Sequence, residues 1–284
     1  MPDQTYDFRS LRISVENQVA TIRLRPISIT FAENPPADPH IDLPSALEAM
    51  RTDNSIRVIV ITGETDGEFL CAGSPDYYRS DRAADRLADP YGQWNVGLGV
   101  LRLAHVMTEI EKPIIAKVNG DAIGFGQSIV FGSDFIVARE DAFISDVHMG
   151  MAEVKRSGTG TPVGLPFGVV PGDGAGALIP LFMPPTQAKE YMMLSATHTA
   201  ADLAEMHIVN RAVPLEELDA VVEHFSTALL KRSAFALAWT KRILNRHVAA
   251  QLNLTLDSSS AYEQLNLLQI QHLGFAGDPT SLQR

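Results

Sequence analysis

Short apolar runs, separated by turns and by helical patterns, occupy the first half of the chain. Alternating apolar and polar residues over 13–24, around Glu16-Asn17-Gln18, predict a β-hairpin that ends at Pro26. The helical spacing of apolar residues over 91–111 predicts an amphipathic helix. Continuous apolar runs predict buried strands of the parallel type at residues 58–63, 114–118, 134–138 and 142–144. Because strands alternate with helices, the pattern predicts an α/β fold built from βαβ units.

Three other segments depart from this alternation. Four prolines between residues 31 and 44 predict a surface loop without a regular helix, followed by a helix over 45–51. Gly, Thr, Ser and charged residues over 148–165 show no apolar period, which predicts a long loop. Beyond Pro184 the pattern is helical, with helices expected at 186–194, 199–206, 214–246 and 258–272.

Composition narrows the classes of function. The 284 residues include 23 Lys and Arg against 34 Asp and Glu, a formal net charge of −11 that disfavours binding to nucleic acid. The lone Cys71 excludes an internal disulfide and a multi-cysteine metal site. No stretch has the length and apolarity of a membrane span, and no secretory leader is recognisable at the N-terminus. We therefore expect a cytoplasmic protein with a small-molecule substrate and no contact with membranes.

Several familiar motifs are missing from the chain. Gly124-Phe125-Gly126 follows a predicted strand, but the third glycine of a dinucleotide-binding motif would fall at Ile129. Neither a phosphate-binding P-loop nor the nucleophile elbow of serine hydrolases occurs. Asp141, Asp146 and His148 form the nearest approach to a metal-ligand cluster, and we interpret Asp146 as a solvated loop residue. We expect no metal and no cofactor.

Three blocks of the sequence, in order, resemble the crotonase (enoyl-CoA hydratase/isomerase) superfamily. They are the strand at 58–63 with Phe69-Leu70-Cys71-Ala72-Gly73-Ser74, the segment 112–120 with Gly124-Phe125-Gly126, and Val170-Pro171-Gly172-Asp173-Gly174-Ala175 followed by residues 200–213. The resemblance implies the ClpP/crotonase-like α/β fold, a spiral of ββα units over residues 1–195. It also implies a C-terminal helical trimerisation region over residues 196–284. A homotrimer or a dimer of trimers is the expected assembly.

The resemblance also implies an oxyanion hole, in which two backbone N–H groups stabilise negative charge on a substrate oxygen. The matching positions are Ser74 and Phe125. Small residues beside them suit the close approach of a substrate oxygen to the main chain, although the glycines also suit tight turns.

The chain departs from the hydratases where they carry their catalytic glutamates. Ser128 occupies the first of these positions and His148 the second, so the carboxylate pair that adds water to an enoyl thioester is absent. His148 together with Asp173 resembles instead the 6-oxocamphor hydrolase-like branch, which hydrolyses carbon–carbon bonds. In this interpretation His148 deprotonates water, and Asp173 orients the imidazole ring of His148. The alternative, without a catalytic role, is that His148 is a hydrogen-bonded loop residue and that Asp173 caps the start of a helix.

Other features bear on the substrate. Glu263 resembles a third catalytic residue of that branch, or it is a solvated acid on a helix face. Tyr77 and Tyr78 follow the oxyanion loop and are candidates for lining the pocket or for plain packing. Residues 149–165 resemble an insertion that reshapes or covers the pocket. The tail from Gly274 has no basic cluster of the kind that binds coenzyme A in the family.

The leading hypothesis is a cofactor-independent hydrolase that cleaves a carbon–carbon bond of a cyclic or hindered β-diketone by a retro-Claisen reaction. One alternative is an enoyl-CoA hydratase, isomerase or lyase that uses His148 on an acyl-CoA thioester. A second alternative is a binding protein of the same fold without catalysis.

Overall fold

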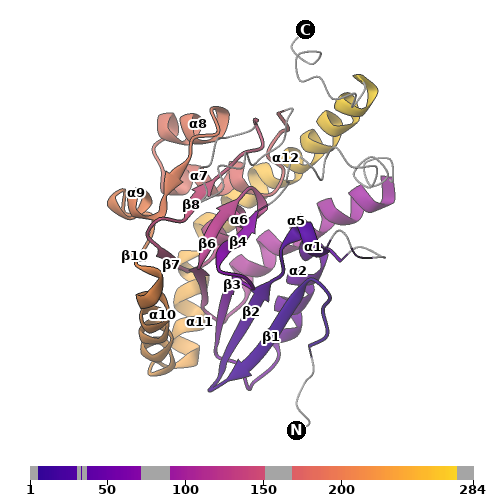
Figure 1. Ribbon diagram of the computed structural model, residues 1–284. Coiled ribbons are helices and arrows are strands. Elements are labelled where there is room, and N and C mark those ends of the chain that lie inside the picture. The colour runs from indigo at the N-terminus through magenta and orange to yellow at the C-terminus, as the bar shows by residue number, and fades with distance from the viewer. Residues whose placement is uncertain (1–5, 31–32, 34–36, 72–89, 151–167, 274–284) are drawn as a thin grey trace.

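The protein consists of two β-sheets surrounded by helices, with a long C-terminal helix along one side (Figure 1). The computed structural model describes residues 6–30, 33, 37–71, 90–150 and 168–273. The strands are β1 (Leu11–Glu16), β2 (Val19–Leu24), β3 (Val58–Gly63), β4 (Gly67–Cys71), β5 (Ile114–Val118), β6 (Gly120–Ile123), β7 (Phe135–Arg139), β8 (Phe143–Ser145), β9 (His198–Thr199) and β10 (Arg211–Val213). The helices are α1 (Ile27–Thr30), α2 (Pro39–Arg51), α5 (Pro90–Glu109), α6 (Phe125–Gly132), α7 (Ala175–Phe182), α8 (Pro185–Met193), α9 (Ala200–Glu205), α10 (Leu215–Leu230), α11 (Ala234–Leu244) and α12 (Arg246–Leu273).

The larger sheet has the strand order β1-β2-β3-β5-β7-β10. The predicted hairpin is confirmed, since β1 and β2 pair antiparallel with Leu11 opposite Leu24. All other neighbours in this sheet run parallel. Every residue of β3 is buried, as expected for a parallel strand covered on both faces.

The smaller sheet, with the order β4-β6-β8-β9, positions the candidate site. The strands β4, β6 and β8 are parallel, and Cys71, Ile123 and Ser145 lie side by side at their carboxyl ends. Because parallel strands end at a common edge, the segments that leave β6 and β8 start next to one another.

The segment before residue 45 differs from the prediction. We expected no regular helix there, but α2 begins at Pro39, with Asp38 as N-cap accepting a hydrogen bond from the His40 N–H. Proline is well accommodated in a first helical turn, where its missing N–H would have no intrahelical partner. Pro44, further along, leaves the His40 carbonyl without a helical donor, and Gly99 of α5 packs directly against that oxygen. Only a glycine fits there, because a Cβ would lie 2.2 Å from the carbonyl oxygen.

The C-terminal part also differs in detail. The continuous helix predicted over 214–246 is two helices, α10 and α11, because the chain turns after Leu230 and Ser233 caps α11. The helix predicted from residue 258 begins at Arg246 instead, as α12. Two short strands that the helical pattern did not predict, β9 and β10, pair with β8 and β7. Their two- and three-residue lengths are too short for an alternating pattern to be visible.

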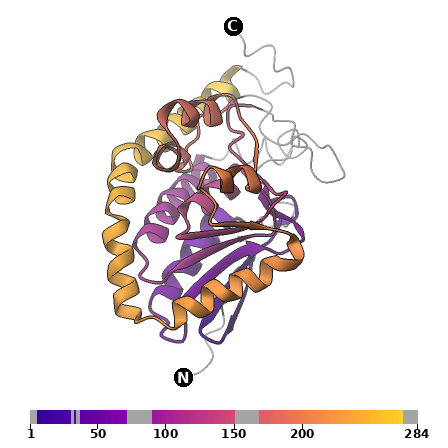
Figure 2. The ribbon, with the colours of Figure 1, turned by 90° about the vertical axis from the view of Figure 1, so that its left-hand side faces the viewer.

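The long helix α12 packs against α5 and α7 and runs along the side of the molecule (Figure 2). Leu252 and Leu256 of α12 are buried, and they form a small apolar cluster with Ala177 of α7. Among the described residues, no helix is long and apolar enough to cross a membrane.

Candidate active site

The site is built first around His148, which follows β8 by three residues. Its ring Nδ1 lies 3.1 Å from Asp146 Oδ1, and its backbone N–H donates to the same oxygen at 3.0 Å. Asp146 is completely buried, so our interpretation of it as a solvated loop residue is wrong. An aspartate two residues before the histidine reaches the ring and the main chain together, which is a common local arrangement for Asp side chains. The Asp-x-His spacing was therefore the signal available in the sequence.

Asp173 faces the second ring nitrogen, with its Oδ2 atom 4.0 Å from His148 Nε2. Its Oδ1 atom accepts a hydrogen bond from the Ala175 N–H in the first turn of α7. Gly174 between them has φ of +94°, which glycine adopts without strain. Asp173 thus holds the start of α7 and also faces His148. The residue hydrogen-bonded to the ring is Asp146, which differs from our expectation that Asp173 orients the imidazole.

Glu263 reaches the site from α12. A Cβ built on Gly172 would lie 2.0 Å from Glu263 Oε2, so this carboxylate lies directly against the Gly172 backbone. One turn further along α12, Asn266 Oδ1 accepts a hydrogen bond from the Val170 N–H at 3.0 Å. The chain leading to Asp173 is therefore held against α12. Residues 148 and 169 are also joined, because the Val169 N–H donates to the His148 carbonyl at 2.6 Å.

These contacts place three carboxylates around one imidazole, and the charges change their pKa values. Burial by itself would lower the pKa of His148, but Asp146 and Asp173, with a smaller contribution from Glu263, raise it to about 10. Burial raises the pKa of Glu263 to about 7, against the opposing effect of the His148 cation. Burial likewise raises the pKa of Asp173. At neutral pH the site therefore holds an imidazolium and a glutamate close to half ionisation.

Phe125 begins α6 directly after β6. Its backbone N–H is in the first helical turn, where N–H groups have no intrahelical acceptor and attract negative charge. Its side chain stacks on the ring of His40, with the ring centroids 3.8 Å apart, which fixes this end of the helix. Gly126 lets the helix start approach β4, since a Cβ there would lie 2.0 Å from the Leu70 carbonyl oxygen. Ser74, Tyr77, Tyr78 and most of the predicted 149–165 loop lie outside the described residues.

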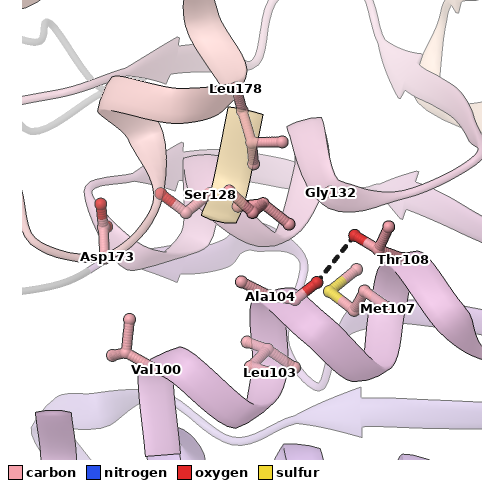
Figure 3. Close-up of a pocket in the computed structure, with 10 residues that line it drawn as sticks. Val100, Leu103, Ala104, Met107, Thr108, Ser128, Gly132, Asp173 and Leu178 are labelled. Atoms are coloured by element: carbon pink, nitrogen blue, oxygen red, sulfur yellow. Dashed lines mark hydrogen bonds between the residues drawn. The ribbon is translucent and has the colours of Figure 1, made fainter. Parts of the chain in front are cut away.

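A small cavity adjoins the cluster (Figure 3). Its volume of about 20 Å³ corresponds to one water molecule. Ser128 of α6 and Asp173 line one side of it, and mostly apolar residues of α5, α7 and α12, together with Thr108 and Gly132, line the rest. Ser128 Oγ and Asp173 Oδ2 are both buried, and hydrogen bonding from Ser128 opposes the rise that burial causes in the pKa of Asp173.

The cluster also contains residue types that bind metal ions. One ligand atom from each of Asp146, His148 and Asp173 lies within 4.8 Å of the others. Asp146 is hydrogen-bonded to the ring Nδ1, and Asp173 faces the other ring nitrogen, Nε2. Hydrogen-bonded in this way, the cluster is suited to proton transfer and charge stabilisation.

Two sheets wrapped by helices, with a helix start and a buried acid–base cluster at the carboxyl ends of the smaller sheet, define a protein of the crotonase fold. The sequence model of the enoyl-CoA hydratase/isomerase family matches residues 36–271, and the chain belongs to this family. The family and the fold expected from the sequence are thereby confirmed.

Individual relatives are distant. The chain is 24% identical over 216 residues to a crotonyl-CoA hydratase of Syntrophomonas wolfei, which covers 76% of this chain and 74% of the relative. It is 30% identical over 193 residues to a carnitinyl-CoA dehydratase of Salmonella typhi, covering 68% and 65% of the two chains.

Solved structures share the fold. An enoyl-CoA hydratase/isomerase from Mycobacterium paratuberculosis has a TM-score of 0.77 at 23% identity, covering 93% of this chain and 96% of the other. A β-diketone hydrolase from the cyanobacterium Anabaena sp. has a TM-score of 0.74 at 18% identity, covering 95% and 99%.

Proposed function

We propose that the protein is a hydrolase that cleaves a carbon–carbon bond of a cyclic or hindered β-diketone, without a cofactor. The observation that carries the proposal is the buried group of His148 and three carboxylates, in a chain that has Ser128 where hydratases carry a catalytic glutamate. A β-diketone hydrolase among the structural neighbours, bound to (S)-3-oxocyclohexyl acetic acid, supports the choice of substrate class.

We base the proposed proton transfers on the charges in the site. His148 is protonated at neutral pH, so it is unsuited to the role of base that we expected from the sequence. Glu263, with a pKa of about 7, is suited to take a proton and to return it. In the proposed reaction Glu263 deprotonates water, and the water oxygen attacks one carbonyl carbon. The His148 cation and the backbone N–H of Phe125, with that of Ser74, stabilise the resulting oxyanion.

Collapse of this tetrahedral intermediate restores the carbonyl and breaks the bond to the carbon between the two carbonyl groups. The electron pair of the broken bond forms an enolate on the departing ketone. Glu263 then returns its proton to the enolate carbon. The product is a keto acid, and water is the only other reactant.

An ultraviolet assay against a panel of cyclic 1,3-diketones, including members with two substituents on the central carbon, tests the proposal. We expect loss of diketone absorbance and a keto acid heavier than the substrate by one water in the mass spectrum. His148→Ala and Glu263→Gln are expected to reduce kcat by at least ~10²-fold. Full activity of both variants would rule out the roles given to these residues.

Thioester chemistry is the second candidate, because the named relatives include a crotonyl-CoA hydratase and a carnitinyl-CoA dehydratase. Coenzyme A or an acyl-CoA would then raise Tm by binding the native state. A dose-dependent rise in Tm, together with no cleavage across the diketone panel, would favour this candidate over the hydrolase.

A further inference from the structure

Asp146 has no role in the reaction as written above, yet it lies nearer to the His148 ring than Asp173 does. It is completely buried at the exit of β8, and one carboxylate oxygen accepts from both the ring and the backbone N–H of His148. Burying an ionised carboxylate is costly unless a charged or hydrogen-bonding partner compensates it. The histidine two residues away supplies both kinds of compensation.

The groups around Asp146 come from four elements. His148 follows the same strand, Asp173 precedes α7, and Glu263 reaches in from α12. From α8, Tyr191 donates its hydroxyl to the Ile144 carbonyl at 3.0 Å and so holds the strand that leads to Asp146. Among these groups His148 is the one cation, and its two ring nitrogens face different carboxylates.

We propose that Asp146 is a positioning residue, which fixes the ring of His148 with Nε2 turned toward Asp173 and keeps the imidazole in its cationic form. A bond from Nδ1 to Asp146 leaves Nε2 as the ring nitrogen that faces Asp173. Without that bond the ring is free to rotate about its side-chain torsions. Without the negative charge, the imidazolium loses its nearest counter-ion.

The effect of Asp146 on turnover rests on the proposed function. The protonation state of His148, by contrast, is measurable without any substrate. The experiment follows the ring nitrogens of His148 by ¹⁵N NMR from pH 5 to 11, assigned by their loss in His148→Ala. Asp146→Asn is the informative variant, because its amide oxygen accepts the same two hydrogen bonds without the charge. Asp141→Asn is the matched control, since Asp141 is an exposed acid on the same segment that pairs with Arg139.

In the unchanged protein we expect the imidazolium signal to persist beyond pH 9, because the pKa of His148 is raised to about 10. In Asp146→Asn the midpoint is expected to fall, and in Asp141→Asn to stay where it was. If the diketone assay succeeds, the alkaline limb of its kcat profile is expected to move with this midpoint, with KM little changed. Asp146→Ala, which removes both hydrogen bonds, is expected to lower kcat further than Asp146→Asn.

A His148 titration in folded Asp146→Asn that superimposes on the unchanged protein would overturn the proposal. Circular dichroism and Tm establish that the variant is folded. If no diketone of the panel is cleaved, the proposed function is overturned. The shift in the titration midpoint of His148 then still tests the positioning role of Asp146.

Discussion

At the scale of single residues, the site differs from a simple pairing of histidine with aspartate. Three carboxylates surround His148, and their combined charge outweighs the burial that would otherwise keep the ring neutral. In the proposed reaction a carboxylate, and not the imidazole, therefore takes the proton from water and returns it. Glu263 is suited to this exchange because burial brings its pKa close to neutrality.

This arrangement predicts a bell-shaped dependence of kcat/KM on pH. Activity is expected to rise as the pH increases through about 7, because Glu263 must be ionised to accept a proton from water. Activity is expected to fall as the pH increases through about 10, because His148 then loses the proton that makes it a cation. Initial rates on a cleaved diketone, measured in constant ionic strength buffers, test both limbs. A profile that instead rises with a single midpoint near 6.5 would indicate an ordinary histidine base.

At the scale of elements, the site depends on the packing of α12 against the chain before α7. Gly172 lies beneath the Glu263 carboxylate, and Asn266 holds the Val170 N–H. Neither contact is local in sequence, since about ninety residues separate the partners. The position of the Glu263 carboxylate is therefore set by tertiary packing between two segments.

Replacing Gly172 by alanine tests this contact. The added methyl would lie 2.0 Å from Glu263 Oε2, so the carboxylate must move away. We expect kcat to fall by ~10-fold or more, and the free energy of unfolding to fall by about 1–3 kcal/mol through overpacking. Gly176→Ala on α7 is the control, because a methyl there meets nothing within 4 Å. It is expected to keep full activity and to gain roughly 0.5–1 kcal/mol of stability. Equal effects of the two substitutions would contradict the prediction.

A second prediction at this scale concerns the attachment of α11. The Lys241 ammonium donates to Asp134 Oδ2 at 2.6 Å and to the Lys112 carbonyl at 3.1 Å, and Lys241 is buried. Lys241→Met would leave the half-buried Asp134 carboxylate without its cation, at an expected cost of about 3–5 kcal/mol in urea denaturation. Asp134→Asn combined with Lys241→Met is expected to recover part of that loss. A double variant as unstable as the sum of the two single variants would argue against coupling between them.

At the scale of the whole molecule, large apolar side chains are exposed on the C-terminal helices. On α11 the exposed residues Phe235, Trp239 and Ile243 are four residues apart and share one face. On α12 the exposed set includes Leu254, Tyr262, Leu265 and Leu268. Apolar surface of this extent is typical of an interface between proteins. We propose that other copies of the same chain cover it, consistent with the trimer that the family resemblance implies.

Phe235→Glu combined with Ile243→Glu is expected to disrupt that assembly, because burying two carboxylates in an apolar interface is unfavourable. Light scattering coupled to size exclusion should give three or six times the 30.9 kDa chain mass for the unchanged protein. The double variant is expected to shift toward the mass of one chain. Ile29→Glu is the control, as an exposed apolar residue of α1, which lies apart from α11 (Figure 1). A monomeric unchanged protein would refute the proposed assembly.

The sequence by itself determined most of the fold. The hairpin and the buried strands at 58–63 and 114–118 were visible because each is a regular run of apolar residues whose period depends on local geometry. The family was likewise visible, because its motifs are contiguous in the chain. Where the apolar pattern predicted the wrong element, or predicted none, the cause was local as well. Pro39 begins a helix instead of preventing one, and strands of two or three residues carry no period.

Only the tertiary structure decided the arrangement of the site. The sequence singled out His148, Asp173 and Glu263, and packing brings these three residues together. It did not show that Asp146 is buried against the ring, because burial depends on what β8 and α7 pack beside it. Nor did it show the charge of His148, since a pKa is set by every charge within a few ångströms and those charges come from segments far apart in the chain.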